Sequence, residues 1–349
     1  MTVRAWAELL RVSALFTVPG DALAGAAASG RCPDRGTALA VGASLCLYEA
    51  GMALNDWADR DEDAVDRPHR PIPSGRIAPG AALTAAGALT AAGLGLAARA
   101  GRPALAVATG LAATVWAYDL RLKHTPAGPA AMAAARGLDL LLGATATGPA
   151  TAPASASGSV SASSAASASA SASASASASA SRGFVRGALP AAGLLGAHTY
   201  AVTAVSRHEA QGGSTIAPLA ALAATAVLGA AALRGQRGSE GTATDPGRGG
   251  STTATHRSST APAVSNGTAS RLIRTALTSS YVRTAAGPLL HAALNPSPPL
   301  TQRAVGGGIR AMIPLQAALA ARAGAFGTGL AVMGLVPLAR TLARKVSLT

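Results

Sequence analysis

Residues 37–54 read TALAVGASLCLYEAGMAL, and residues 55–66, which follow directly, read NDWADRDEDAVD. The first run is apolar and close to the length of about 20 residues that a helix needs to cross a bilayer. The second run holds six of the fifteen acidic residues of the whole chain. A spanning helix that ends in such a segment predicts a cluster of carboxylates at a membrane surface.

The composition of the whole chain is also typical of a membrane protein. Of 349 residues, 49% are hydrophobic and 13% are charged, which is about half the charged share of an ordinary globular domain. The composition therefore predicts an all-α, polytopic membrane protein with nine spanning helices. Besides 37–54, the predicted spans are 8–29, 80–98, 102–118, 128–147, 186–205, 215–233, 303–322 and 325–341.

Three segments do not fit this pattern. The Ser/Ala alternation at 152–182 and the Gly/Ser/Thr-rich stretch at 235–269 have almost nothing to bury, so we expect both to be disordered. Residues 270–295 carry Arg271, Arg274 and Arg283 beside an apolar face, which favours a helix in the membrane interface, with a tenth span as the alternative. The expected divisions are 1–151 (helices 1–5), 152–182, 183–234 (helices 6–7), 235–269 and 270–349 (the interfacial helix and helices 8–9).

The net charge of +14 does not indicate a nucleic-acid partner, because the basic residues are scattered among apolar runs and form no stripe with aromatics. Two cysteines are too few for a disulfide framework. With the N-terminus in the cytoplasm, the loops after the second, fourth and sixth spans are basic and cytoplasmic, as the positive-inside rule requires. The basic residues near 340–345 contradict this orientation if the spans number nine.

The acidic segment has the spacing of a metal site. Asn55, Asp59 and Asp63 step by four residues, which places their oxygens on one face of a continuing helix. Carboxylates this close repel unless a cation joins them, and hard oxygen ligands suit Mg²⁺. Arg67 and Arg70 follow within RPHRPIPSG, and guanidinium groups suit phosphate. The alternative is a charged loop whose residues pair with each other in water.

These residues carry a resemblance to a known family. NDWADRDED at 55–63, followed by RPHRPIPSG at 67–75, resembles the first signature of the UbiA-type intramembrane prenyltransferases. The resemblance implies nine helices around a central cavity, a prenyl diphosphate bound through Mg²⁺, and transfer of the prenyl group to an aromatic or other lipophilic acceptor. It also implies that Asn55, Asp56, Asp59 and Asp63 bind the metal. By the same resemblance, Arg67 and Arg70 lie near the diphosphate.

Two other loops extend the comparison. YDLRLK at 118–123 resembles a family element in which the lysine binds diphosphate, which implies substrate-binding roles for Tyr118 and Lys123. The loop after the sixth span departs from the family, because it lacks the usual second aspartate-rich motif and has Arg207, His208 and Glu209 instead. Glu209 is then the candidate for a second metal, while Arg207 and His208 are candidates for the phosphate. With this departure, the chain resembles a divergent bacterial branch of the family.

The resemblance therefore implies a membrane prenyltransferase whose site loops face the cytoplasm, with the acceptor unidentified. The residues expected to act in the reaction are Asp56, Asp59, Asp63, Lys123 and Glu209. The alternatives are a non-catalytic carrier or partner subunit, which the missing second motif favours, and a transporter component. Within the spans, Arg136 and Asp139 are candidates either for a site or for pairing across one helical turn. For His198 and Gln316 we expect hydrogen bonds between helices.

Overall fold

The computed structural model describes residues 3–146, 165–209, 212–234 and 263–338. All regular structure in these ranges is helical, which confirms the all-α class. The helices are α1 (Val3–Leu9), η1 (Val12–Thr17), α2 (Pro19–Ala28), α3 (Arg35–Ala58), α4 (Arg60–Asp66), α5 (Pro79–Ala100), α6 (Arg102–Ala117), η2 (Tyr118–Leu122), α7 (Gly128–Thr145), α8 (Ala165–Ser206), α9 (Ile216–Leu233), α10 (Ala263–Leu294), α11 (Pro298–Arg322) and α12 (Phe326–Met333).

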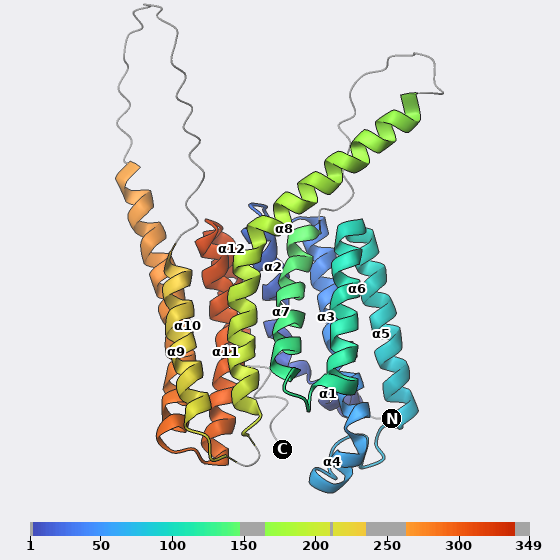
Figure 1. The fold of residues 1–349 in the computed structure, drawn as a ribbon, viewed down its shortest axis with the longest axis vertical. Helices are drawn as coiled ribbons and strands as arrows, with labels where there is room; N and C mark the ends of the chain where they lie inside the picture. Colours follow the sequence, from blue (N-terminus) through green and yellow to red (C-terminus); the bar gives the residue numbers. More distant parts are fainter. Residues whose placement is uncertain (1–2, 147–164, 210–211, 235–262, 339–349) are drawn as a thin grey trace, which may run out of the picture.

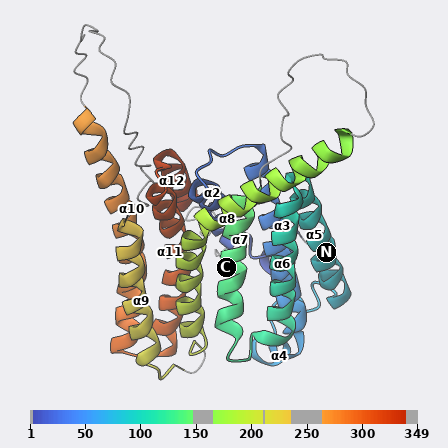
Figure 2. The same ribbon diagram turned by 45° about the horizontal axis from the view of Figure 1, so that its top comes forward.

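The long helices run side by side as a bundle (Figure 1). One group contains α3, α5, α6 and α7, the other contains α8, α9, α10, α11 and α12, and the two groups meet where α7 packs against α8. Helix α2 packs against members of both groups and lies between them when the bundle is turned (Figure 2). Small residues permit this packing, since a Cβ at Gly143 of α7 would overlap with the backbone of Ala22 in α2.

In the part of the chain that the structure describes, five helices are long and apolar enough to cross a membrane by length and composition: α3, α5, residues 183–206 of α8, α9 and α11. The other predicted spans fall on helices that are shorter or less apolar. Helix α3 begins with a capping box, in which the Asp34 side chain accepts a hydrogen bond of 2.8 Å from the backbone N–H of Thr37. Its 24 residues end at the acidic segment.

The span expected at 8–29 is interrupted in the structure. Helix α1 ends at Leu9, the 3₁₀-helix η1 follows, and α2 begins at Pro19. Arg11 lies in the break and has a φ of 49°. Among the described residues, it is the one non-glycine residue with a positive φ. Its left-handed backbone and Pro19 account for the break, because neither continues a regular α-helix.

The structure also bears on the Ser/Ala stretch and on residues 270–295. Helix α8 begins at Ala165, so residues 165–181 of the Ser/Ala stretch are helical, which agrees with the high helix propensity of alanine. Residues 152–164 of that stretch and 235–262 of the second one lie outside the described residues. Helix α10 begins at Ala263 and packs along α9 and α11 through buried side chains such as Leu277 and Tyr281. This packing fits a further bundle helix better than an interfacial one.

Candidate functional site

The acidic segment lies at the end of the bundle where α3 passes into α4 (Figure 1). The backbone N–H of Asp59 donates to the carbonyl of Asn55 at 2.9 Å, and the N–H of Asp63 donates to the carbonyl of Asp59 at 2.8 Å. These two bonds span the junction at Asp59, where α3 ends and α4 begins. The three side chains expected on one face have different partners, which are Asp119 for Asn55, Lys123 for Asp59 and Arg70 for Asp63.

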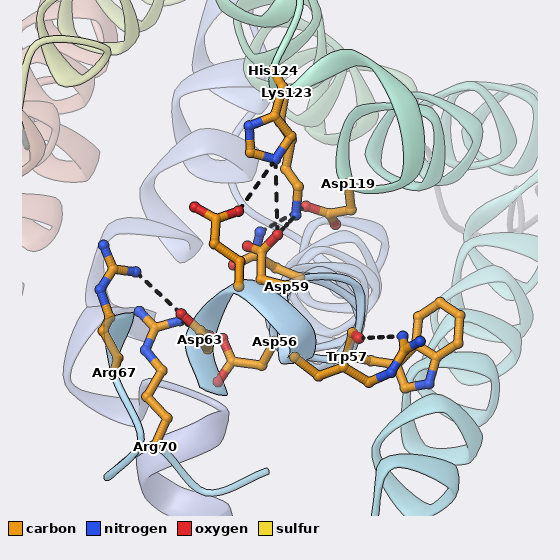
Figure 3. A network of polar contacts seen from close by, with 12 residues as sticks. Asp56, Trp57, Asp59, Asp63, Arg67, Arg70, Asp119, Lys123 and His124 are labelled. Atoms are coloured by element: carbon orange, nitrogen blue, oxygen red, sulfur yellow. Dashed lines mark hydrogen bonds and ion pairs between the residues drawn. The ribbon is translucent and has the colours of Figure 1, made fainter. Parts of the chain in front are cut away.

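Two of the aspartates contact the arginines of the following loop. Nη1 of Arg70 lies 2.6 Å from Oδ2 of Asp63 and 3.5 Å from Oδ1 of Asp56, and Nη1 of Arg67 lies 3.5 Å from Oδ1 of Asp63 (Figure 3). Asp63 is only 2% exposed. A carboxylate this deeply buried needs a partner of opposite charge, and the Arg-Pro loop supplies it. The acidic segment and the Arg-Pro loop thus form one cluster.

The third aspartate faces the segment after α6. Lys123 Nζ donates a hydrogen bond to Oδ1 of Asp59, and His124 Nε2 lies 3.9 Å from the same oxygen and 4.0 Å from Oε2 of Glu62 (Figure 3). Asn55 donates from Nδ2 to Oδ1 of Asp119 at 3.4 Å. Asp119 and Lys123 lie in or next to η2, a single π-helical turn, and such turns are frequent at functional sites.

Asp119 was not among the residues expected from the sequence. Burial raises the pKa of the Asp119 carboxyl to about 7, and the charge of Lys123 acts in the opposite direction. Tyr118 beside it also has a raised pKa, first because of burial and then because of the Asp119 and Asp59 charges. The signal for Asp119 in the sequence was its position directly after an apolar run, two residues before Arg121.

Arg11 is the second residue that sequence reasoning missed. Its Nη2 donates to Oδ1 of Asp56 at 3.2 Å and to Oδ1 of Asn55 at 3.5 Å. The segment that carries Arg11 is also held by an ion pair, since Nη1 of Arg76 lies 2.6 Å from Oε2 of Glu8. A charged residue inside the apolar run at 8–29 was the available signal.

The loop after α8 reaches the same end of the bundle. Arg207 donates from Nη1 to the carbonyl of Thr125 at 3.0 Å, which joins this loop to the Lys123 segment. Burial raises the pKa of the Glu209 carboxyl, and the charge of Arg67 opposes that rise. Among the described residues, none forms a hydrogen bond or ion pair with the His208 side chain. The expected site residues therefore gather at one end, with His208 the least engaged.

The oxygen donors at this end fit a divalent cation. Within the described chain, the Asp59, Glu62 and His124 ligand atoms lie within 4.8 Å of one another. Glu209 does not join this group, whereas Glu62 and His124 were not expected to belong to it. Asn55 and Asp56 add an amide and a further carboxylate beside it. A donor set dominated by carboxylate and amide oxygens matches the preference of Mg²⁺.

A cavity of about 240 Å³ opens between α3, α6 and α7 beside this cluster. Asn55, Arg11 and Asp119 line its outer end, and its walls include apolar side chains such as Leu111 and Val115. The α3 residues that line the cavity recur at helical spacing. They are Ser44, Leu47, Tyr48, Gly51, Met52 and Asn55.

The inner end of the cavity is polar, and Ser44, Tyr48, Arg136 and Asp139 line it. Arg136 lies 3.9 Å from Asp139, one helical turn away, which agrees with the expected pairing of the two. The closer partner of Arg136 is Asp21 of α2, at 2.5 Å. Gln316 donates to Asp21 at 2.6 Å, and His198 contacts the Tyr281 hydroxyl at 3.1 Å and the Gly308 carbonyl at 3.0 Å. The expectation that His198 and Gln316 bond between helices is confirmed.

Relatives of known name match parts of this chain. Residues 14–236 match the model of the UbiA prenyltransferase family. The digeranylgeranylglyceryl phosphate synthase of Methanopyrus kandleri is 38% identical over 129 residues, which are 36% of this chain and 46% of that protein. The protein of the same name from Natronomonas pharaonis is 36% identical over 148 residues, or 42% and 53% of the two chains. The chain thus spans about half the length of the curated relatives it matches.

Solved structures share the fold over nearly the whole chain. The apo structure of a UbiA homolog from Aeropyrum pernix has a TM-score of 0.53 and 17% identity, and the match covers 92% of this chain and 98% of that one. A UbiA homolog from Archaeoglobus fulgidus, bound to DMAPP and Mg²⁺, has a TM-score of 0.52 and 17% identity, with coverage of 94% and 99%. At this identity the likeness is one of fold.

Proposed function

Because the chain belongs to the UbiA prenyltransferase family, we propose that it transfers an isoprenyl group from a prenyl diphosphate to a lipophilic acceptor in a reaction that requires Mg²⁺. Its apolar helices and its family make it a multi-pass membrane protein. The observation that carries the proposal is the meeting of carboxylates, arginines and Lys123 at the outer end of an apolar-walled cavity. The Archaeoglobus fulgidus homologs with DMAPP or GPP and Mg²⁺ support the choice of donor and metal.

In this proposal Asn55, Asp56, Asp59 and Asp63 hold the metal, which neutralises charge on the diphosphate when bound. Among the described residues, Arg70 contacts only Asp56 and Asp63, both through Nη1, so its other N–H groups remain to donate to phosphate oxygens. Lys123 and Arg67 add positive charge beside it. These cations stabilise the diphosphate as the C–O bond to the prenyl carbon breaks.

The cavity walls supply the second half of the mechanism. Leu47, Leu111 and Val115 exclude water from the prenyl carbon. Water that reached this carbon would react with it in place of the acceptor and hydrolyse the donor. The acceptor then forms the new bond to that carbon and loses a proton. Transfer therefore requires the donor at the outer end and the acceptor within the cavity.

The direct test is release of diphosphate by the purified protein from an allylic prenyl diphosphate. We expect release with Mg²⁺ and none after chelation with EDTA. Asp59→Asn should lower release by about 100-fold. The neighbour Asp61 serves as the matched control, because its side chain is 87% exposed and, among the described residues, pairs only with Arg60. Absence of release from any allylic donor would contradict the proposal.

A carrier that binds a prenyl diphosphate without turnover is the second candidate. It is favoured by one feature of the 207–209 loop, which offers a single carboxylate, Glu209, where the family resemblance implies a second aspartate-rich motif. Tight donor binding without diphosphate release, unchanged by Glu209→Gln, would support the carrier. A drop in release by Glu209→Gln would support a metal-binding role of Glu209 in an enzyme.

A further inference from the structure

We propose that the inner end of the cavity binds an uncharged hydroxyl or carbonyl oxygen of the acceptor through Tyr48 and Ser44. This inference rests on the proposed function and deepens it by naming the chemical class of the acceptor. It starts from a polar end in a cavity whose walls are otherwise apolar. The diphosphate site does not use these residues, because Tyr48 precedes Asn55 by seven positions, or about 10 Å along the α3 axis.

Tyr48 has an unused hydroxyl at this place. Its side chain lines the cavity, and its ring lies 6.0 Å from the guanidinium carbon of Arg136. Within the described residues, the Tyr48 hydroxyl has no hydrogen-bond partner. A phenolic O–H can both donate and accept. A ligand oxygen in the cavity would satisfy it, and leaving such a group unpaired in an apolar setting is costly.

Ser44 adds a second contact point. Ser44 donates from Oγ to Oδ1 of Asp139 at 2.5 Å, so the serine oxygen remains free to accept. Asp139 itself is engaged, because it also contacts the Asp21 carboxyl and lies 3.9 Å from Arg136. Ser44 therefore accepts from a ligand hydroxyl, while Tyr48 donates to a hydroxyl or carbonyl.

The charges at the inner end argue against an anionic ligand. Arg136 is the cation there, and it already lies 2.5 Å from Asp21. A phosphate or carboxylate at the inner end would find, among the described residues, no positive charge there that is not already shared with the Asp21 and Asp139 carboxyls. Apolar walls also disfavour any ion that arrives without its own partner. The complementary group is therefore an oxygen without charge.

The test is titration calorimetry on the full-length protein in detergent, without donor or metal. Its probes are para-hexylphenol, its O-methyl ether and para-hexylbenzoate. We expect the phenol to bind, the ether to bind several-fold more weakly, and any binding of the benzoate, whose carboxylate suits the cations at the outer end, to be unchanged by Tyr48→Phe. Tyr48→Phe should weaken phenol binding by about three- to tenfold, the size of one lost hydrogen bond. Tyr200→Phe on α8, where the ring is 48% exposed, is the matched control.

Thermal unfolding of each variant without ligand establishes that it is folded. Equal affinity for the phenol and its ether, or the same loss in Tyr48→Phe and Tyr200→Phe, would overturn the inference. Ser44→Ala gives a second measurement if Tyr48→Phe proves unstable, and it should weaken phenol binding as well. Since the titration includes neither prenyl diphosphate nor Mg²⁺, its failure leaves diphosphate release unaffected, and failed release leaves phenol binding unaffected.

Discussion

Arg11 donates a hydrogen bond of 3.2 Å from Nη2 to Oδ1 of Asp56, although 45 positions separate the two residues. Arg70 approaches the same oxygen at 3.5 Å. Two guanidinium groups, one before the acidic segment in the chain and one after it, therefore share the buried carboxylate of Asp56. The N-terminal segment thus takes part in the arrangement of the site.

This relationship predicts a loss of donor affinity in Arg11→Ala. The variant removes one cation from the outer end of the cavity and one of two guanidinium partners from Asp56. Since the Arg11 side chain is 39% exposed, we expect a moderate effect, an increase of about tenfold in KM for the prenyl diphosphate. Steady-state diphosphate release measures it. Arg99→Ala, an exposed change on α5, should leave KM unchanged, and an equal effect of both variants would contradict the prediction.

Substitution of Asp59 should change the Mg²⁺ dependence of the rate more than substitution of Asp61. Asp59 contacts Lys123 and lies in the group with Glu62 and His124, whereas Asp61 faces solvent. We expect Asp59→Asn to lower turnover by about 100-fold and to raise the Mg²⁺ concentration needed for half-maximal rate. Asp61→Asn should behave as the unchanged protein. Titration of diphosphate release with Mg²⁺ distinguishes the two, and equal sensitivity would argue that net charge alone matters.

The ion pair between Glu8 and Arg76 predicts a small, pH-dependent contribution to stability. The hydrogen bond from Arg76 lowers the pKa of the Glu8 carboxyl below its ordinary value of 4.5. A carboxyl with a lowered pKa stabilises the fold above 4.5 and loses that effect as the pH falls through the folded value. We expect Glu8→Gln to cost about 0.2–1 kcal/mol at neutral pH, as exposed pairs do.

Thermal unfolding of the two proteins over a pH series measures this difference. The gap between unchanged protein and Glu8→Gln should close at acidic pH. A gap that persists once Glu8 is protonated would mean that the substitution acts through packing of α1 and not through the charge.

Local patterns were enough to predict a cluster of carboxylates with arginines beside it. The carboxylates follow one another at the end of α3 and in α4, and the Arg-Pro loop follows them directly in the chain. An apolar run of sufficient length likewise predicted α3 and most other helices. These features depend on neighbours within a few residues, which a sequence displays.

Partners distant in the chain could not be predicted in the same way. Arg136 was weighed only against Asp139, three residues on, but its closer partner is Asp21, which precedes it by 115 positions. Arg11 was missed because the apolar run at 8–29 suggested one uninterrupted helix. In both cases the contact depends on how helices pack, and helical periodicity carries no information about which faces meet.

Gly51 predicts a narrow point in the cavity between its outer and inner ends. A Cβ at this position would lie 3.0 Å from Cγ1 of Val115 and 3.9 Å from Oδ2 of Asp119. Gly51→Val should therefore fill the cavity and block the acceptor while the metal-binding side chains stay in place. We expect prenyl transfer to fall by about tenfold or more while donor binding changes little. Gly87→Val on α5, where a Cβ would meet open space, is the matched control.

The orientation expected from the positive-inside rule can be tested with a native residue. Cys32 is exposed and precedes α3, whereas Asn55 and the acidic segment lie at the other end of that helix. If the site faces the cytoplasm, Cys32 faces the outside. A charged maleimide that does not cross membranes should then label Cys32 in intact cells, and Cys32→Ser should abolish the label. Labelling that appears only after the cells are opened would reverse the orientation and place the carboxylates and Lys123 on the outer surface, where a prenyl diphosphate made in the cytoplasm could not reach them.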